Sequence, residues 1–350
     1  MTTTSPAFSS VVRAEFAPTT TYLNSASYGL LPKSVVAAVI EAEEQRMRGE
    51  FDIPGVDSII DECRAAFGRL TGFGAEQVAV GSQVSQLVGL VAQSLRPGAN
   101  VLVPEHEFNS VLWPFLVRTD LNVRVVPLAE LPDAIRPGDD VVAAAVVQSA
   151  DGAVLDVAAT VAAARAHGAR VLFDLSQAAG WLPVHDTGAD WIVSVGYKWL
   201  LGPKGTAFLA GTPAALDDLT PVAAGWYAGY NPWETCYDGP LRLAPDARRF
   251  DVGPVWPAWI GQRRSLELIE QVGVETIHRH DVALADRLRK GLGLPEGNSA
   301  VVSIEVAEAA LERVRAAGIV GAMRAGRLRL ACHLYNTEDE IDRALDALLG

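Results

Sequence analysis

Three predicted strand ends in this sequence carry polar side chains suited to one kind of chemistry. Lys198 follows the apolar run Trp191 to Val195 and is itself followed by apolar residues. Lysine is among the side chains least often buried. An amine held in such surroundings has a depressed pKa and is available for Schiff-base chemistry. A surface lysine just past a strand end is the alternative interpretation.

Asp174 closes the preceding apolar run, Arg170 to Phe173. A carboxylate at the end of a buried strand is poorly solvated and needs a cationic or N–H partner. A protonated ring nitrogen would be such a partner, and Gln177 is near enough to assist. A helix cap or a structural salt bridge is the alternative role for Asp174.

The third strand end is the segment Gly81 to Ser85, which precedes a predicted helix. Free backbone N–H groups at a helix start, together with serine hydroxyls, can hold a phosphate, although serine there also serves as an ordinary cap. A lysine, an acid and a phosphate-binding turn are what pyridoxal phosphate requires. The lysine forms the imine, the acid keeps the pyridine nitrogen protonated, and the turn holds the phosphate.

Strands and helices alternate between residues 78 and 211, which predicts a mainly parallel α/β sheet covered on both faces. Ligands of such sheets bind beyond the carboxyl ends of the strands. We expect an extended N-terminal stretch over residues 1–20, a large domain over 21–257 that ends in a loop-rich aromatic segment, 223–257, and a small α+β domain over 258–350. The predicted strands of the sheet are Val78 to Val80, Val101 to Val103, Asn122 to Val126, Val141 to Val147, Arg170 to Phe173, Trp191 to Val195 and the segment 206–211.

Composition excludes several classes of partner. The net charge of −13 opposes binding to nucleic acid or to an anionic membrane, because both attract basic surfaces. The longest apolar runs are far too short to cross a bilayer, and no signal peptide is visible. The three cysteines are widely spaced and odd in number, which predicts reduced thiols in a cytoplasmic protein and no metal site.

Three motifs carry a resemblance to a known family. They are Asp-x-x-Gln-Ala-x-Gly from Asp174, Tyr-Lys-Trp-Leu-x-Gly-Pro-x-Gly from Tyr197, and Leu-Tyr-Asn-Thr-x-x-Glu-Ile-Asp from Leu334. Together they resemble the class V aminotransferase family of fold-type I pyridoxal phosphate enzymes, which also contains cysteine desulfurases, kynureninases, isopenicillin N epimerase-like proteins and carbon–sulfur lyases. The resemblance implies a seven-stranded, mainly parallel sheet in the large domain, an amino-acid substrate and a homodimer with shared active sites.

The resemblance also implies roles for individual residues around the cofactor. Lys198 would be the Schiff-base lysine, Asp174 the partner of the pyridine nitrogen, and Gln177 a hydrogen-bond donor to the phenolic oxygen. Phe108 falls where the family stacks an aromatic ring on the pyridine, with His106 as the competitor. The remaining contacts, all to the cofactor phosphate, are expected from Ser85, the Val84 N–H and Tyr197.

Two further residues are implied to bind the substrate. Arg329 falls where the family pairs an arginine with the substrate α-carboxylate, and Arg327 is the nearest alternative. A guanidinium suits this task because its fork binds a carboxylate bidentately. Trp226 lies in the aromatic segment, which in relatives reaches a neighbouring subunit's active site. It would line the substrate pocket or pack in a dimer interface.

The sequence departs from the desulfurase pattern in the region before Arg329, which contains no cysteine. Cys332 is expected to be a core thiol, and Cys236 is the thiol expected near the pocket. These departures favour β-elimination, a carbon–sulfur lyase type of side-chain cleavage, over desulfuration. An aminotransferase or an epimerase of the same family is the alternative, and a non-catalytic cofactor-binding or scaffold protein is the alternative from another class.

Overall fold

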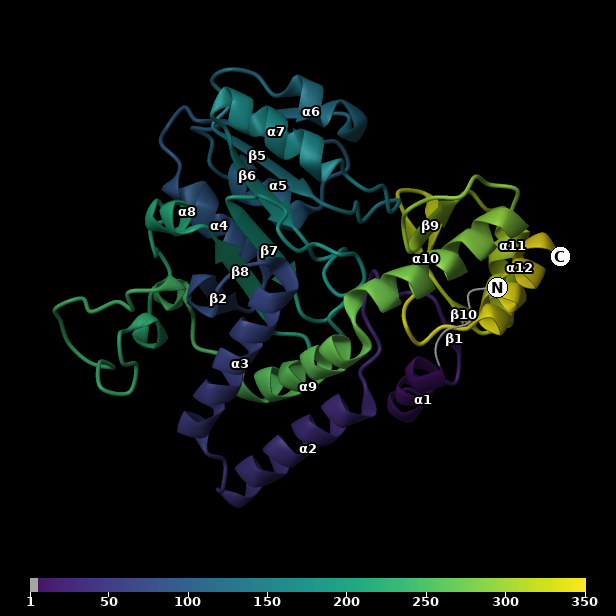
Figure 1. Ribbon diagram of the computed structural model, residues 1–350, viewed down its shortest axis with the longest axis horizontal. Helices are drawn as coiled ribbons and strands as arrows, with labels where there is room; N and C mark the ends of the chain where they lie inside the picture. The colour runs from purple at the N-terminus through teal and green to yellow at the C-terminus, as the bar shows by residue number, and fades with distance from the viewer. Residues whose placement is uncertain (1–5) are drawn as a thin grey trace.

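The structure, a computed structural model, describes residues 6–350. Seven strands form its large sheet in the order β2-β8-β7-β6-β5-β3-β4, as Figure 1 shows in part. Strand β8 runs antiparallel to both of its neighbours, and the other adjacent strands are parallel. The strands are β2 (Val78–Gly81), β3 (Asn100–Pro104), β4 (Asn122–Val126), β5 (Val141–Ala145), β6 (Arg170–Asp174), β7 (Trp191–Val195) and β8 (Ala207–Gly211).

Each face of the large sheet is covered by its own apolar core. Successive residues of a strand point to opposite faces. In β5, Val142 and Ala144 belong to one core, whereas Val141 and Ala143 belong to the other. The first core includes residues of α3 (Ile53–Thr71), α7 (Val157–His167) and α9 (Trp256–Val272), and the second includes residues of α4 (Val84–Ser94), α5 (Asn109–Leu116) and α8 (Pro213–Asp217).

A smaller antiparallel sheet lies beside the large one, in the order β11-β12-β9, and α9 and α10 lead to it (Figure 1). Its core is shared with three helices and with Leu23 from the N-terminal part of the chain. These elements are β9 (Val301–Ile304), β11 (Ala322–Arg324), β12 (Arg327–Ala331), α10 (Val274–Gly291), α11 (Glu308–Ala316) and α12 (Glu338–Leu349). The remaining elements are β1 (Thr21–Tyr22), β10 (Ile319–Val320), α2 (Lys33–Arg48), α6 (Leu131–Ala134), η1 (Ala75–Gln77), η2 (Leu128–Glu130), η3 (Trp226–Ala228) and η4 (Ala247–Phe250).

The predicted α/β fold with seven strands and a small α+β part is confirmed. The predicted domain boundaries stay predictions. Strand β1 pairs with β10, so the start of the predicted large domain also contributes to the C-terminal layer. No helix among residues 6–350 combines the length and the apolar character needed to cross a membrane.

The prediction of an extended N-terminal stretch is wrong for Pro6–Glu15, which forms helix α1. Residues 1–5 lie outside the described residues. Proline is tolerated in the first turn of a helix, where its missing N–H has no helical partner. Val12 is buried, and the Glu15 carboxylate accepts hydrogen bonds from the backbone N–H and the hydroxyl of Ser34, at 2.9 and 2.7 Å. Tertiary contacts therefore stabilise a helix that the composition disfavours.

A buried ion pair fastens the segment 223–257 to the sheet. Asp251 is fully buried and pairs with Arg64 of α3, and its Oδ1 also accepts the backbone N–H of Val80, at 2.8 Å. Arg64 donates in addition to the backbone oxygen of Val78, at 2.8 Å. Strand β2, helix α3 and the aromatic segment therefore meet at one carboxylate.

We predict that Asp251→Ala lowers the free energy of unfolding by about 3–5 kcal/mol, because it leaves the Arg64 charge buried without its partner. Urea unfolding of the purified protein measures this loss. Asp61→Ala is the matched control, because Asp61 also pairs with Arg64 but is 63% exposed. Its effect should stay below about 1 kcal/mol. Equal losses in the two variants would contradict the interpretation.

Candidate active site

Lys198 lies in a tight turn after β7 and is 7% exposed. Backbone hydrogen bonds close this turn, from Gly202 N to Gly196 O at 2.8 Å and from Gly196 N to Thr206 O at 2.9 Å. Gly29, far away in the sequence, donates its N–H to the oxygen of Tyr197 at 2.9 Å. The lysine is therefore held by backbone contacts from two separate parts of the chain.

Gln262 of α9 organises the inside of this turn. Its Oε1 accepts the Thr206 hydroxyl at 2.7 Å, and its Nε2 donates to the Ser265 hydroxyl at 2.9 Å. A Cβ atom at Gly196 or Gly202 would lie 1.9 or 2.0 Å from the same Oε1 atom. Only glycine leaves room for this buried amide at both positions.

The Lys198 amine lies among charged and aromatic groups. Its Nζ is 5.2 Å from the centre of the Phe108 ring. Burial lowers the pKa of Lys198 to about 8; Asp174 opposes the shift, and the nearby charges of Arg329 and Arg324 add to it. Because an ordinary lysine has a pKa near 10.4, a far larger fraction of this amine is neutral at physiological pH.

Asp174 ends β6 and is buried. Its Oδ1 accepts the backbone N–H of Ser176 at 2.8 Å. Burial raises the pKa of Asp174, while the Ser176 hydrogen bonds and the charge of Lys198 oppose the shift. Strands β6 and β7 are parallel neighbours, so the acid and the amine lie at the same edge of the sheet, as predicted from their positions at strand ends.

Gln177 is close to these groups, but its amide is already engaged. Its Nε2 donates to the backbone oxygen of Ala26 at 2.8 Å and to the Ser149 hydroxyl at 3.1 Å. Its Oε1 accepts the Trp199 indole N–H at 2.8 Å. A hydrogen bond from Gln177 to a cofactor oxygen would therefore replace one of these contacts.

Phe108 stands at the start of α5 with its ring 45% exposed. An exposed ring above a buried amine offers a flat apolar face to a planar ligand. His106, the competitor for this role, is exposed and occupies a left-handed backbone conformation with φ of 59°. The geometry favours Phe108 as the residue that would stack on a planar cofactor.

Glu107, between these two residues, is a buried carboxylate that the sequence interpretation passed over. Its two oxygens accept the backbone N–H groups of Phe108 and Ala145, both at 2.7 Å. It thereby fastens the turn that carries Phe108 to the end of β5. Burial raises its pKa to about 7; the backbone hydrogen bonds oppose the shift, and the charge of Asp174 adds to it.

Arg329 of β12 is 1% exposed and points toward polar groups rather than an acid. Its guanidinium donates to the backbone oxygen and the hydroxyl of Ser149 and to the Ser27 hydroxyl at 2.8 Å. Its Nε is buried without a hydrogen-bond partner. Burial lowers the pKa of Arg329 to about 10, with Arg324 contributing. Arg327, the alternative, already pairs with Glu305 at 2.7 Å.

The start of α4 follows β2, which runs parallel to β7, so it reaches the same edge of the sheet as Lys198. Val84 is the first helical residue, and the N-cap, Gln83, makes no side-chain cap. Ser85 is exposed. The free N–H groups of this first turn form an anion-binding end. Tyr197, which precedes Lys198, is half-buried, and its ring lies 5.5 Å from that of Tyr28.

Trp226 is not brought to this cluster. Its ring contacts are with Tyr227 and Trp233, at 5.2 Å each, and both of these residues donate hydrogen bonds to Asp57 of α3. In Figure 1 the segment 223–257 projects from the side of the large sheet that lies away from the small sheet. Its proposed place in a substrate pocket therefore requires a second subunit.

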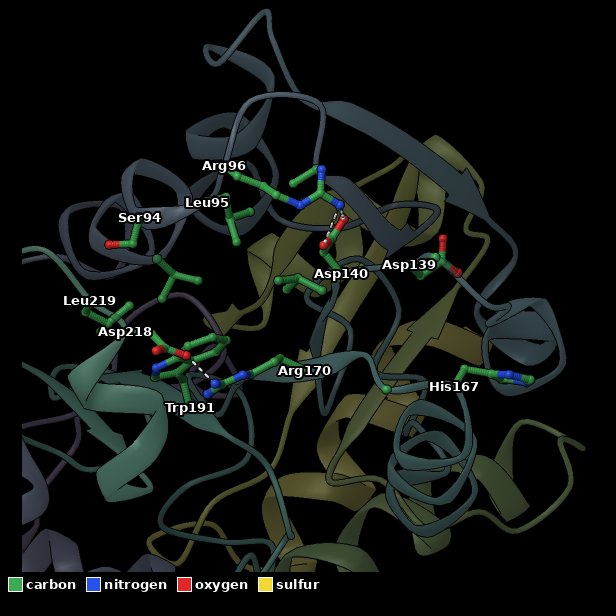
Figure 2. Close-up of a pocket in the computed structure, with 15 residues that line it drawn as sticks. Ser94, Leu95, Arg96, Asp139, Asp140, His167, Arg170, Trp191, Asp218 and Leu219 are labelled. Atoms are coloured by element: carbon green, nitrogen blue, oxygen red, sulfur yellow. Dashed lines mark hydrogen bonds and ion pairs between the residues drawn. The ribbon is translucent and has the colours of Figure 1, made fainter.

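A cavity of about 550 Å³ lies at the opposite edge of the large sheet (Figure 2). It is lined by the first residues of β5, β6 and β7, which are Val141, Arg170 and Trp191. Its arginines are already paired, Arg96 with Asp140 and Arg170 with Asp218. The cavity holds neither the lysine nor the acid of the site described above, so we do not place the chemistry there.

The sequence interpretation missed the residues that support the site. They are Glu107, Gln262 and the hydroxyls of Ser27 and Ser149. A carboxylate that follows a buried strand was a usable signal for Glu107. Gln262 gave no signal, because it lies within a helix and acts on a turn some sixty residues away.

The Aminotransferase class-V family matches residues 21–319. The chain belongs to this family. Its members are pyridoxal phosphate enzymes that act on amino-acid substrates and are typically dimeric. The residues described above fit that cofactor, because a buried amine, a buried acid, an exposed aromatic ring and a free helix start share one edge of the sheet.

Relatives of the class-V chain support the same membership. The isopenicillin N epimerase of Streptomyces clavuligerus is 28% identical, and the match covers 95% of this chain and 96% of the relative. The uncharacterized aminotransferase YcbU of Bacillus subtilis is 29% identical, with 82% of each chain covered. Among solved structures, the cystine C–S lyase C-DES has a TM-score of 0.84 at 21% identity, covers 94% and 97% of the two chains, and shows a shared fold.

We predict that pyridoxal phosphate attaches to the apoprotein at a rate that rises with pH and has its midpoint near pH 8. The reason is that only the neutral Lys198 amine is nucleophilic, and burial lowers its pKa to about 8. Stopped-flow absorbance between pH 6.5 and 10 measures the rate, and Lys198→Ala should show no attachment. A midpoint near pH 10 would mean that the amine is solvated.

We predict that Glu107→Gln changes how stability depends on pH. The folded-state pKa of Glu107 is raised to about 7, above its unfolded value, so the carboxyl stabilises the fold below about pH 4.5 and this contribution is lost as the pH rises through 7. The variant lacks this loss. Relative to wild type it should therefore gain on the order of 2 kcal/mol between pH 5 and pH 8. Urea unfolding at both pH values measures the difference, and a constant difference would contradict the assignment.

Proposed function

We propose that this class-V enzyme cleaves the side chain of a small α-amino acid or its conjugate by β-elimination, with Lys198 as the base. One observation carries the role of Lys198, and the lack of a cysteine in the region before Arg329 favours β-elimination over desulfuration. A buried amine with a pKa lowered to about 8 lies between an acid and an aromatic ring, near an arginine, Arg329, that has no acidic partner among residues 6–350. Bound pyridoxal phosphate supplies an electron-withdrawing ring that stabilises negative charge at the substrate α-carbon.

Arg329 would position the substrate. Its buried fork donates to the hydroxyls of Ser27 and Ser149, which a carboxylate would replace with a stronger, charge-assisted pair. The unpartnered Nε also gains an acceptor in that exchange. Holding the α-carboxylate at Arg329 fixes which bond at the α-carbon faces the Lys198 amine.

Lys198 would then take the α-proton at Nζ, and the leaving group would depart from the β-carbon with its electron pair. Asp174 would hold a proton at the ring nitrogen of the bound cofactor, and Phe108 would cover a face of its ring. Ser85, the Val84 N–H and Tyr197 would bind the phosphate, and Gln177 would bind the phenolic oxygen. For a thioether the net change is RSCH₂CH(NH₃⁺)COO⁻ plus water to RSH, pyruvate and ammonium.

Two observations favour other outcomes of the same first steps. The Streptomyces relative, an isopenicillin N epimerase, covers nearly the whole of both chains and favours epimerisation at the α-carbon. The Bacillus relative, named an uncharacterized aminotransferase, favours transamination. Desulfuration is disfavoured, because Cys63 and Cys332 are buried with burial-raised pKa values and Cys236 lies in the aromatic segment beside Pro232.

We also propose that the enzyme works as a homodimer in the cytoplasm. The aromatic segment supports the dimer, since it projects from the protomer with exposed Tyr230, Trp233 and Tyr237. In such a dimer Trp226 would line the active site of the neighbouring subunit. The odd number of free cysteines supports a reducing compartment.

The holoenzyme should release pyruvate and ammonia in equal amounts from cysteine S-conjugates in deuterated water. Lys198→Ala should lower the rate at least 10³-fold, roughly the contribution of a general base. Cys236→Ser is the control and should keep the wild-type rate.

Each competing reaction leaves a different product in the same assay. Conversion of the cofactor to its amine form without ammonia would indicate transamination. Deuterium at the α-carbon of recovered substrate with a changed optical rotation would indicate epimerisation. Loss of activity in Cys236→Ser would indicate persulfide chemistry, and any of these results would replace β-elimination.

A further inference from the structure

Three arginines project from one face of the small sheet. Strand β11 pairs antiparallel with β12, and the register places Arg324 opposite Arg327 and Ala322 opposite Arg329. Residues opposite each other in an antiparallel pair share a face, and so do residues two apart in one strand. The side chains of Arg324, Arg327 and Arg329 are therefore neighbours on the face that carries the buried guanidinium of the active site.

Only one of the three arginines is neutralised. Arg327 pairs with Glu305. Arg324 and Arg329 have no salt bridge with any of residues 6–350, although the sequence holds 42 acidic residues against 29 basic ones. Both instead donate to the Ser27 hydroxyl, at 3.2 and 2.8 Å. The Ser27 hydroxyl is the acceptor that both guanidiniums share. Their other acceptors, two oxygens of Ser149 and the backbone oxygen of Met323, are also neutral.

The two guanidiniums are close to each other, and their charges act on the Lys198 amine. Because both Nη2 atoms reach the same oxygen, they lie at most about 6 Å apart. The charge of Arg324 contributes to the lowered pKa of both Arg329 and Lys198. Arg324 is exposed, whereas Arg329 is buried, so Arg324 forms the outer part of this positive site.

We infer that Arg324 binds an anionic group on the substrate side chain, so that the enzyme acts on amino acids with a second negative charge. The short separation of the guanidiniums selects an anion two to four atoms beyond the α-carbon. A carboxylate or a sulfonate would provide it. The inference rests on the proposed role of Arg329 in holding the α-carboxylate.

A matched pair of cysteine conjugates tests this charge requirement. S-carboxymethyl-L-cysteine and S-carbamoylmethyl-L-cysteine have nearly the same shape and differ by one negative charge. The dissociation constant of each for the holoenzyme is measured from the change in cofactor absorbance, and kcat/KM from pyruvate release. Wild type should prefer the carboxymethyl conjugate by about 10- to 100-fold in both, as expected for a charge-assisted contact. L-glutamate and L-glutamine form a second pair for binding.

Arg324→Gln should reduce this preference to about twofold or less, and the loss should lie in the binding of the anionic member. Arg315→Gln is the control, because Arg315 is an exposed arginine of the same domain that pairs with Glu308. It removes the same charge and should keep the preference. An equal loss in both variants would mean that net charge, not Arg324, attracts the anion.

The binding measurement separates this inference from the proposed reaction. Absence of pyruvate with a retained preference in binding would overturn β-elimination and leave the role of Arg324 standing. Pyruvate release without any preference in either pair would overturn the role of Arg324. Failure of the anionic member of both pairs to bind would overturn it as well.

Discussion

The active site depends on one costly arrangement, an amine kept out of water. Lowering the pKa of Lys198 from 10.5 to about 8 costs about 3 kcal/mol of folding free energy at neutral pH. The amine is kept buried by a turn whose backbone is held in place by close contacts. Glycines at positions 196 and 202 admit the Gln262 amide, and His333 bonds the Trp199 oxygen at 3.1 Å. These contacts rigidify the backbone on both sides of the lysine.

The polar groups around the amine differ in whether the protein supplies their hydrogen-bond or charge partners. Asp174, Glu107 and Gln177 all have hydrogen-bond partners in the protein, so they are fixed in place. Arg329 and Arg324, in contrast, donate to neutral oxygens only, and they share one of these, the Ser27 hydroxyl. The arginines without an acidic partner thus lie where the substrate would bind. The side chains that are fixed by hydrogen bonds lie where the cofactor would bind.

The fold could be predicted from local patterns, and so could the position of Lys198 and Asp174 at one edge of the sheet. Short apolar runs mark the strands. Asp174 closes one of these strands, and Lys198 follows the next strand after two residues. Helix α1 could not be predicted, because it is stabilised by burial and by Ser34 rather than by its own composition. The contacts that support the site could not be predicted either. Glu107 meets Ala145 across 38 positions, and Arg329 meets Ser27 across 302, and spacing in a single sequence carries no record of such pairs.

The N-terminal segment between Leu23 and Gly29 makes backbone hydrogen bonds to both the small layer and the turn that carries Lys198. Leu23 exchanges backbone hydrogen bonds with Val320 and Ala331 of the small layer, at 2.9 and 2.8 Å, and Gly29 bonds the turn of the lysine. Between these contacts the segment folds into a turn, in which the backbone N–H groups of Ser27 and Tyr28 both donate to the oxygen of Asn24, at 2.9 and 3.1 Å. The same seven residues therefore contact both the small layer and the backbone beside the amine, so a change in their backbone would alter the small layer and the turn of the lysine together.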